Sequence, residues 1–363
     1  MTSALPAVLH VRAKWLKESE TFVADLVRAR SIQRPALAYR WRLNEEREPL
    51  PARSLRLDVD FEDPPVLARA PDGLPPVDVV HAHFGWDLPL AAELARVLER
   101  PLAVSFHGAD ASQRLRRPEW VDRYRRLLPG AAAITVAHAS LAPGLLELGA
   151  PRERVRVVPT GVDLRFWRAA REGRREGTTR LLSVGRLEEK KGHGVLLEAL
   201  ARVVAGGREL ELAVVGEGRL RDELESRAHA LGLASRVHLL GGLSRQEVRA
   251  QMRLADLFVL ASHTASDGNR EGVPVALKEA QAARLPVLAT RHSGVPEAVL
   301  DGVSGILVEE GDAAGLAEGL ERLLERRSEW RRMGAAGRRH VGSLYQRSAV
   351  LAAWGELYRE LAR

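Results

Sequence analysis

The stretch Leu181-Leu-Ser-Val-Gly-Arg-Leu-Glu-Glu-Lys-Lys-Gly-His-Gly-Val-Leu-Leu-Glu-Ala-Leu200 contains, in order, a short apolar run, a loop with glycine and cations, and the start of a helical pattern. Residues 181–184 predict a buried strand, and residues 195–204 place apolar side chains at helical spacing. The same alternation continues on both sides of this stretch. It is typical of a mostly parallel sheet covered by helices, so the sequence predicts an α/β protein.

The predicted elements form two groups, one before and one after a charged segment. In the first group, strands are predicted at 7–11, 77–81, 102–106, 132–136 and 155–158, with helices at 21–30, 88–99 and 118–128. In the second group, strands are predicted at 181–184, 210–215, 237–240, 257–260 and 287–289, with helices at 195–204, 220–231, 247–254 and 274–283. A last apolar stripe at helical spacing predicts a helix in residues 343–363.

The chain length also indicates two domains, because 363 residues are too many for one ordinary core. Residues 166–180 are charged, include two glycines and show no sustained apolar face, so we place the linker there. We therefore expect an N-terminal domain at 1–165, a linker at 166–180 and a C-terminal domain at 181–342. The helix at 343–363 is expected to pack back on the first domain.

Composition excludes several kinds of chemistry and partner. The chain has no cysteine, which excludes disulfides, thiolate metal sites and a cysteine nucleophile. It has no run of eighteen apolar residues and no secretory signal pattern, so a cytoplasmic location is expected. The net charge of +7, carried mainly by arginine, fits either a solvated Arg/Glu surface or contact with an anionic partner such as a membrane face. Arginine clusters at 114–126 and 322–339 form no recognisable nucleic-acid module, so no nucleic-acid partner is expected.

The loop after the strand at 181–184 carries the first candidate binding residues. Gly185 permits a close backbone approach, while Arg186 and Lys191 place two cations where the chain enters a helix. This combination suits a diphosphate, through charge-assisted hydrogen bonds and helix N-terminal amides. The alternative is a solvated turn with no ligand. Two of the only five lysines in the chain lie here. A coding bias toward arginine over lysine does not explain this concentration.

A second candidate is the segment Glu271-Gly-Val-Pro-Val-Ala-Leu-Lys-Glu279, with Pro274 in a first helical turn. If the whole segment is helical, its two glutamates lie about 12 Å apart. That distance is too long for the carboxylate pair of a retaining glycosidase, at about 5 Å. It suits one carboxylate at a sugar and the other at a ribose hydroxyl. The alternative is two surface glutamates on an amphipathic helix.

Two further strand ends carry polar or glycine-rich motifs, which matters because open α/β sheets bind ligands at the carboxyl ends of strands. After residues 102–106, His107 is a candidate to act at the site, with Asp110 orienting it or contacting the sugar, and the alternative is a structural histidine. The earlier motif His81-Ala-His-Phe-Gly-Trp86 is interpreted as structural. After residues 210–215, Gly216 and Gly218 are candidates for a tight turn beside a nucleotide base, since Arg221 replaces the third glycine of a dinucleotide fingerprint.

The motifs in the second half occur in an order that resembles the retaining family-four glycosyltransferases. The resemblance rests on Ser183-Val-Gly-Arg-Leu187 with Lys190-Lys-Gly192, on Val215-Gly-Glu-Gly-Arg-Leu220, on Asp267-Gly-Asn-Arg-Glu-Gly-Val-Pro-Val-Ala-Leu-Lys-Glu-Ala280, on Pro286-Val-Leu-Ala-Thr-Arg-His-Ser-Gly-Val-Pro-Glu297 and on Asp301-Gly-Val-Ser-Gly-Ile-Leu-Val308. It spans nearly all of residues 181–312. It is looser in the first half, where Phe106-His-Gly-Ala-Asp110 and Pro159-Thr-Gly-Val-Asp163 carry it.

The resemblance implies the GT-B fold, in which two Rossmann-like domains face each other across a cleft. It also implies a metal-independent, retaining transfer of a sugar from a nucleotide-diphosphate donor. Arg186 and Lys191 would hold the diphosphate, together with backbone amides from Gly272 and Val273 to Pro274. Glu271 would contact the donor sugar, with His107 stabilising the reacting sugar, and Glu279 would hold the ribose.

The acceptor is less well defined by the sequence. Ser19-Glu-Thr-Phe22 resembles a subgroup that builds exopolysaccharides such as colanic acid, so we expect a saccharide or lipid-linked saccharide acceptor and peripheral contact with the inner membrane face. The glycine-rich loop that many members have after their first strand is absent from Val11-Arg-Ala-Lys-Trp-Leu-Lys-Glu18. UDP-sugars are favoured over GDP- or ADP-sugars, and no cofactor or metal is expected. A nucleotide-sugar epimerase on the same fold and a non-catalytic sugar-nucleotide-binding protein remain alternatives.

Overall fold

The computed structural model describes residues 4–15, 20–43, 50–168 and 177–363. The chain divides into two compact units, the first formed by Met1–Gly161 with Ser348–Arg363 and the second by Val162–Arg347. The division therefore lies before the predicted linker, most of which, residues 169–176, is outside the described residues. Trp167 is 1% exposed and packs in a core of the second unit. The charge of this segment predicted a linker, but its buried apolar side chains attach its beginning to the second unit.

The first unit is built on a seven-stranded parallel sheet with the order β5-β3-β1-β6-β7-β8-β9. Its strands are β1 (Ala7–Val11), β3 (Arg34–Tyr39), β5 (Ser54–Arg56), β6 (Val79–Ala82), β7 (Leu102–Phe106), β8 (Ala133–Val136) and β9 (Val155–Val157). A separate parallel pair joins β2 (Lys14–Trp15) to β4 (Trp41–Arg42). The sequence missed β3 and β5, because β3 begins with arginine and proline and β5 is a three-residue edge strand without a buried side chain.

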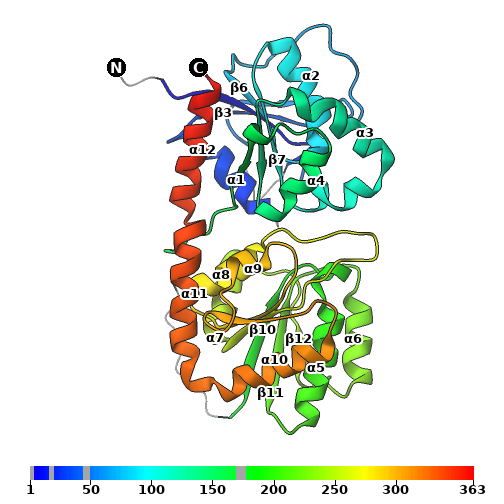
Figure 1. Cartoon of the computed structure of the whole chain (residues 1–363), viewed down its shortest axis with the longest axis vertical. Coiled ribbons are helices and arrows are strands. Elements are labelled where there is room, and N and C mark those ends of the chain that lie inside the picture. Colours follow the sequence, from blue (N-terminus) through cyan, green and yellow to red (C-terminus); the bar gives the residue numbers. More distant parts are fainter. Residues whose placement is uncertain (1–3, 16–19, 44–49, 169–176) are drawn as a thin grey trace. The chain divides into compact units, whose positions relative to one another are not determined.

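Helices cover both faces of this sheet (Figure 1). They are α1 (Thr21–Val27), α2 (Leu88–Leu98), α3 (Pro118–Leu127), α4 (Ala142–Glu147) and the C-terminal α12 (Arg347–Leu361). Trp354 and Tyr358 of α12 share a buried cluster with strand residues Val8 and Val79. The other face packs α2 and α3 against the same strands through residues such as Leu94 and Trp120.

The second unit has a six-stranded parallel sheet with the order β12-β11-β10-β13-β14-β15. Its strands are β10 (Thr179–Val184), β11 (Leu210–Val215), β12 (Val237–Leu239), β13 (Leu257–Leu260), β14 (Val287–Thr290) and β15 (Gly305–Val308). Its helices are α5 (His193–Ala205), α6 (Arg221–Ala230), α7 (Arg245–Leu254), α8 (Val275–Ala282), α9 (Val295–Ala298), α10 (Ala313–Glu325) and α11 (Trp330–Tyr345). Separate apolar clusters lie on the two faces, so the predicted α/β class with two Rossmann-like units is confirmed.

The C-terminal segment contains two helices where the sequence predicted one helix from residue 343. α11 ends at Tyr345 and α12 begins at Arg347. The intervening Gln346 forms an isolated parallel bridge with Val162, whose N–H donates to the Tyr345 carbonyl at 2.7 Å and whose carbonyl accepts from the Arg347 N–H at 3.0 Å. These backbone bonds break the helix, a long-range effect that helical periodicity does not reveal.

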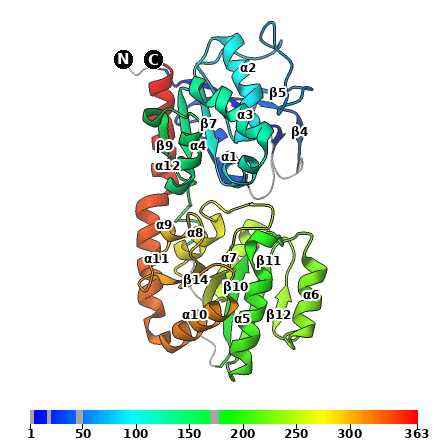
Figure 2. The same cartoon turned by 45° about the vertical axis from the view of Figure 1, so that its right-hand side comes forward.

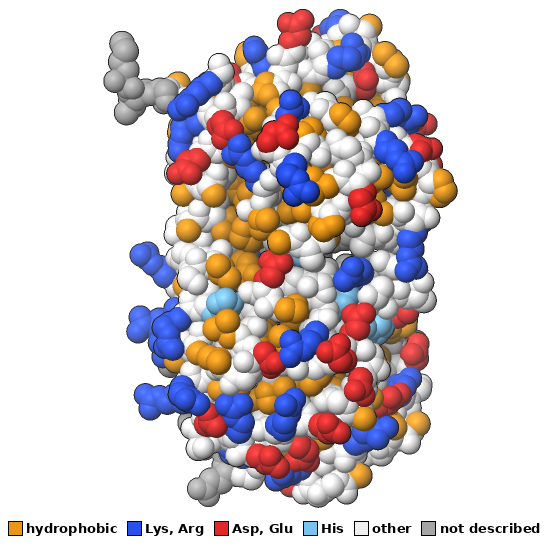
Figure 3. Space-filling model, in the orientation of Figure 1, with side chains coloured by type: hydrophobic (Ala, Val, Ile, Leu, Met, Phe, Trp, Pro, Cys, Tyr) orange, Lys and Arg blue, Asp and Glu red, His pale blue; other side chains and the backbone are white. Residues whose placement is uncertain are grey.

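Charged side chains of both signs are interspersed over the face drawn in Figure 3, as expected for a solvated Arg/Glu surface. Many arginines form surface ion pairs, for example Arg236 with Glu209 at 2.9 Å and Arg221 with Glu225 at 3.0 Å. Such pairs contribute little to stability. Within the described ranges, no helix has both the length and the apolar character needed to cross a membrane.

Candidate functional site

The centre of the candidate site is a buried group of three charged side chains in the second unit. The Glu271 carboxylate lies 3.1 Å from the Lys191 Nζ and 3.3 Å from the Lys190 Nζ, and all three side chains are about nine-tenths buried. Lys190 also donates to Asn269 Oδ1 at 3.1 Å. The structure thus joins two residues that the sequence assigned to different parts of the ligand, Lys191 to the diphosphate and Glu271 to the sugar.

These charges determine the ionisation of the group. Burial would raise the pKa of Glu271, but the ammonium groups of Lys191 and Lys190 outweigh it and lower that pKa to about 2. Burial lowers the pKa of Lys191, and Glu271 opposes this shift. Glu271 is therefore a carboxylate at any physiological pH. It can orient cations or accept hydrogen bonds, but it is a poor proton acceptor.

Strand order explains why these residues meet. β10 lies beside β13, so the loops that follow the two strands leave the same edge of the sheet as neighbours. The His263 N–H donates to the Lys190 carbonyl at 3.0 Å and joins the two loops. Gly192 has φ +68°, and a Cβ there would lie 1.8 Å from the Ala261 carbonyl oxygen. Only glycine allows this close approach.

Gly185 and the glycines after β11 complete the loop packing. A Cβ on Gly185 would lie 3.1 Å from the Lys191 Cδ and Cε, so glycine lets the lysine chain pass over the backbone. Gly216 and Gly218 have φ +144° and +157°, and their Cβ positions would lie 2.0 Å from the Gly185 oxygen and 2.4 Å from the Leu187 oxygen. These two glycines thus bring the β11 loop against the β10 loop. Their placement beside a nucleotide base stays a prediction.

Arg186 lies at the exposed side of this group. Its side chain is 48% exposed and is paired with Glu188, not with Glu271. Its charge still contributes to the lowered pKa of Lys191, after the larger effect of burial. The loop therefore presents two buried cations held by Glu271, Lys190 and Lys191, and one exposed cation, Arg186, that can reorient toward an anion.

A second ordered network, which the sequence did not predict, supports the Glu271 backbone. The Glu271 N–H donates to His292 Nε2 at 3.0 Å, and His292 Nδ1 is hydrogen-bonded to Glu310. Since Nε2 accepts, Nδ1 carries the proton. Thr264 donates to the other Glu310 oxygen at 3.0 Å. Burial lowers the pKa of His292, which favours this neutral form. The sequence signal that could have indicated this network is His292 itself, which follows β14 within the quoted motif Pro286–Glu297.

The structure corrects the helical geometry assumed for residues 271–279. α8 begins at Val275, with Pro274 as its N-cap residue in an extended conformation. Because the residues before Pro274 are not helical, the separation of about 12 Å does not follow from helical rise. Gly272 and Val273 lie in a bend just before α8, while Glu279 is half-buried on the helix itself. Their contacts with phosphate and ribose stay predictions.

In the first unit, the loop after β7 holds His107 in an aromatic environment. The His107 ring centroid lies 4.7 Å from that of Phe22 and 4.9 Å from that of Phe84. Asp110 is fully buried, and its carboxylate accepts hydrogen bonds from the backbone N–H groups of His107 and Gly108 at 2.9 Å and of Gly85 at 3.1 Å. Asp110 therefore fixes the loop that carries His107, and its contact with a sugar stays a prediction.

A buried group of charged side chains lies after β1, where many members of the family have a glycine-rich loop. Arg12 follows β1, is 1% exposed and donates to Glu20 at 2.8 Å and to Asp87 at 3.3 Å. Its guanidinium lies 4.4 Å from the Phe84 ring centre. Burial raises the pKa of Asp87 to about 7, against the opposing charge of Arg12. Glu20 belongs to the motif Ser19–Phe22, whose Ser19 is outside the described residues.

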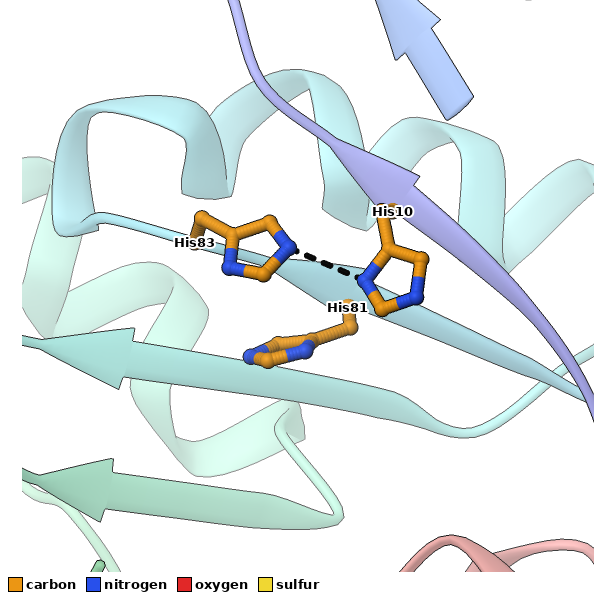
Figure 4. Close-up of side chains that lie close together, drawn as sticks. All are labelled: His10, His81 and His83. Atoms are coloured by element: carbon orange, nitrogen blue, oxygen red, sulfur yellow. Dashed lines mark hydrogen bonds between the residues drawn. The ribbon is translucent and has the colours of Figure 1, made fainter. Parts of the chain in front are cut away.

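His10, His81 and His83 form a buried cluster with metal-ligand spacing (Figure 4). Both ring nitrogens of His10 are hydrogen-bonded, to His83 at 2.9 Å and to Gln33 at 2.8 Å. Both nitrogens of His81 are also used, by Tyr358 at 2.8 Å and Ser105 at 2.7 Å. Burial lowers the pKa of His10 to about 4 and lowers those of His81 and His83 strongly. The cluster is thus a neutral hydrogen-bonded chain that ties α12 to the sheet.

Comparison with known proteins agrees with this architecture. The family description "Glycosyltransferase Family 4" matches residues 21–166, and "Glycosyl transferases group 1" matches residues 168–340. The amylovoran biosynthesis glycosyltransferase AmsK of Erwinia amylovora is 33% identical over 78% of this chain and 70% of its own length. The putative colanic acid biosynthesis glycosyltransferase WcaL of Escherichia coli is 34% identical over 86% of this chain and 77% of its own.

Solved structures show the same fold at low sequence identity. Anabaena Alr3699/HepE, crystallised with UDP and glucose, superposes with a TM-score of 0.81 at 18% identity, over 98% of this chain and 100% of that one. The sucrose-phosphate synthase of Thermosynechococcus elongatus gives 0.78 at 19% identity, over 98% and 99% of the two chains.

Proposed function

Because the chain belongs to the family-four glycosyltransferases, we propose that it transfers a sugar, with retention of anomeric configuration, from a nucleotide-diphosphate donor to an acceptor hydroxyl. The observation that carries the proposal is the buried Lys190–Glu271–Lys191 group beside exposed Arg186. This group lies at the carboxyl edge of the second unit's sheet, where open α/β sheets bind ligands. It supplies the positive charge that a leaving diphosphate requires.

In this proposal Lys191 and Arg186 neutralise the diphosphate as the bond between the sugar and the phosphate oxygen breaks. Glu271 holds the Lys191 ammonium in place, so that little reorganisation accompanies the charge development. Amides at Gly272 and Val273 add donors before α8. Lys191 and Glu271, which the sequence assigned to the diphosphate and to the sugar, thus both act at the diphosphate. Contact between Glu271 and the donor sugar is a further part of the proposal.

The low pKa of Glu271 bears on the route of the proton. A carboxylate with a pKa of about 2 is a weak base, so Glu271 is poorly suited to take the acceptor hydroxyl proton. A departing phosphate oxygen on the same face of the sugar is the better acceptor. Attack of the hydroxyl on that face forms the new bond with retention, and the proton leaves with the nucleotide diphosphate. No metal is needed for this step.

We further propose a UDP-sugar as donor and exopolysaccharide assembly as the process. Anabaena Alr3699/HepE, which shares the fold, was crystallised with UDP-glucose. The relatives named above are described as amylovoran and colanic acid glycosyltransferases. A saccharide or lipid-linked saccharide is accordingly the proposed acceptor. His107 remains the proposed contribution of the first unit.

The test combines donor hydrolysis with product analysis. Purified protein is incubated with UDP-, GDP- and ADP-glucose, with and without EDTA, and released nucleotide is measured before acceptors are added. Turnover of one donor, unaffected by EDTA and reduced at least tenfold in Arg186→Gln, supports the proposal. An inverted product anomer by NMR contradicts retention, loss of turnover with EDTA contradicts metal independence, and full activity of Arg186→Gln contradicts the diphosphate site.

A further inference from the structure

A cavity lies in the first unit, away from the charged group of the second unit. It has a volume of ≈ 680 Å³, within the range of small-molecule sites, and is lined mainly by β2, β4 and the end of β5. Figure 2 labels β4 and β5 at the edge of this unit. β2 follows β1 and β4 follows β3, and since β1 and β3 are parallel neighbours, the cavity lies at the carboxyl edge of the sheet. Open α/β sheets bind ligands at this edge.

The lining is strongly basic. It includes Lys14, Arg40, Arg42 and Arg56, and no carboxylate is among its described residues. Lys14 and Arg56 are exposed and form no ion pair with any described residue. Several other arginines of the unit are paired with carboxylates, as with Arg114, which lies 2.9 Å from Glu62. Positive charge concentrated around a cavity attracts anions.

An exposed tryptophan fixes one of these cations. Trp41 is 42% exposed, and all six other tryptophans, which also lie in the described part of the chain, are buried or half-buried. The Arg40 guanidinium lies 4.2 Å from the Trp41 ring centre, and the Lys14 Nζ lies 5.7 Å from it. The buried Nε of Arg40 has no hydrogen-bond partner among the described residues, and one of its terminal nitrogens lies 3.6 Å from Asp60. A guanidinium held against an indole presents its N–H edge in a fixed direction.

We propose that this cavity is an acceptor subsite for a phosphorylated saccharide, with the phosphate on Arg40, Arg56 and Lys14 and the sugar beside Trp41. Several cations around one cavity favour an anion with more than one charge, and guanidinium groups match phosphate oxygens in pairs. The assignment of the cavity to the acceptor rests on the proposed function. The affinity of the cavity for a phosphorylated sugar does not rest on that function. An experiment can therefore contradict the subsite or the proposed transfer, one without the other.

The phosphate could belong to a free sugar phosphate or to a lipid-linked sugar diphosphate, and the probes separate these sources. Calorimetry on the full chain, saturated with UDP, measures binding of glucose 1-phosphate, of a short-chain polyprenyl diphosphate glucose and of a glucuronate oligosaccharide. We expect Arg40→Gln and Arg56→Gln each to weaken binding of a phosphorylated probe about tenfold. Arg40→Lys retains the positive charge but loses the paired N–H groups of the guanidinium. It should therefore bind more tightly than Arg40→Gln but less tightly than wild type. Arg69→Gln and Arg125→Gln, at exposed positions of the same unit, are the matched controls.

The outcomes are distinguishable. The proposal is supported if the variants lose affinity for glucose 1-phosphate or for the lipid-linked probe while UDP affinity, donor hydrolysis and thermal unfolding stay unchanged. In transfer assays the same variants should raise the KM for the acceptor and leave kcat within about twofold. Equal binding by wild type and variants overturns it, as does an effect confined to the glucuronate probe. If wild type binds the phosphorylated probes through these arginines but turns over no donor, the subsite stands and the proposed transfer fails.

Discussion

The Glu271 carboxylate and the Lys191 ammonium are 3.1 Å apart in a position where both side chains are about nine-tenths buried. A buried ion pair is costly to separate, because removing one partner leaves the other charge without compensation. Here one carboxylate also compensates Lys190. The charge balance of the candidate diphosphate site therefore depends on one carboxylate.

Replacing Glu271 by Gln should show this dependence directly. The variant keeps the shape of the side chain but leaves two buried ammonium groups facing each other, so we expect the free energy of unfolding to fall by about 3 kcal/mol. Turnover of the donor should fall about 100-fold. Urea unfolding and steady-state rates measure the two effects. Glu321→Gln, which removes a surface partner of Arg208, is the control and should change neither. A fully active, equally stable Glu271→Gln would contradict the role of this pair.

Gly192→Ala tests the close approach of the two loops. The added Cβ would meet the Ala261 carbonyl at 1.8 Å, so the loop carrying Lys191 must move. We expect UDP affinity to fall at least tenfold and stability to fall by about 2 kcal/mol. Gly232→Ala is a matched control, since Gly232 has nearly the same φ, +70°, with no atom within 4 Å of its Cβ position. It should cost only about 1 kcal/mol and leave UDP binding intact. Equal effects at both positions would show that backbone strain alone is responsible.

His292 is expected to act as a positioning residue for Glu271. His292→Ala removes the acceptor of the Glu271 N–H and should cost about 1–3 kcal/mol, with UDP affinity reduced several-fold. His292→Gln offers an amide oxygen to the same N–H and should recover part of both losses. Calorimetry with UDP and urea unfolding provide the measurements. If Gln and Ala behave alike, the hydrogen bond to Glu271 is not what His292 contributes.

The buried histidine chain predicts an acid limit for the first unit. His10 has a folded-state pKa of about 4 against 6.5 in a solvated chain, so the unfolded state takes up protons first as pH falls. The stabilising effect is complete above pH 6.5 and is lost between pH 6.5 and about 4. His10 alone accounts for about 3 kcal/mol, at 1.36 kcal/mol per pKa unit.

Thermal unfolding between pH 4 and 8 measures this loss. His10→Asn, which is neutral throughout, should flatten the pH dependence, while His229→Asn on the exposed surface of α6 should not. A pH-independent transition of the wild-type first unit would contradict the buried neutral cluster.

The alternation of apolar runs and helical segments predicted the α/β class, two parallel sheets and the loops where chemistry occurs. Four strands appear with the bounds expected, at 7–11, 102–106, 210–215 and 257–260. These features depend on side chains within a few residues of one another, and local periodicity records them. β3, β5 and β15 were missed, because β3 begins with arginine and proline, β5 is only three residues long and ends in arginine, and β15, though fully buried, is a four-residue run that begins with glycine.

The pairing of the site residues was decided by tertiary structure alone. Lys190 and Lys191 meet Glu271 because β10 lies beside β13, with β11 and β12 placed on the other side of β10. Likewise, Arg12 meets Asp87 and Gly192 meets Ala261 across long stretches of chain. The sequence determined which polar residues follow the carboxyl ends of the strands. Strand order determined which of them share a low-dielectric environment, where a nearby charge sets whether a carboxylate is a base or a fixed anion.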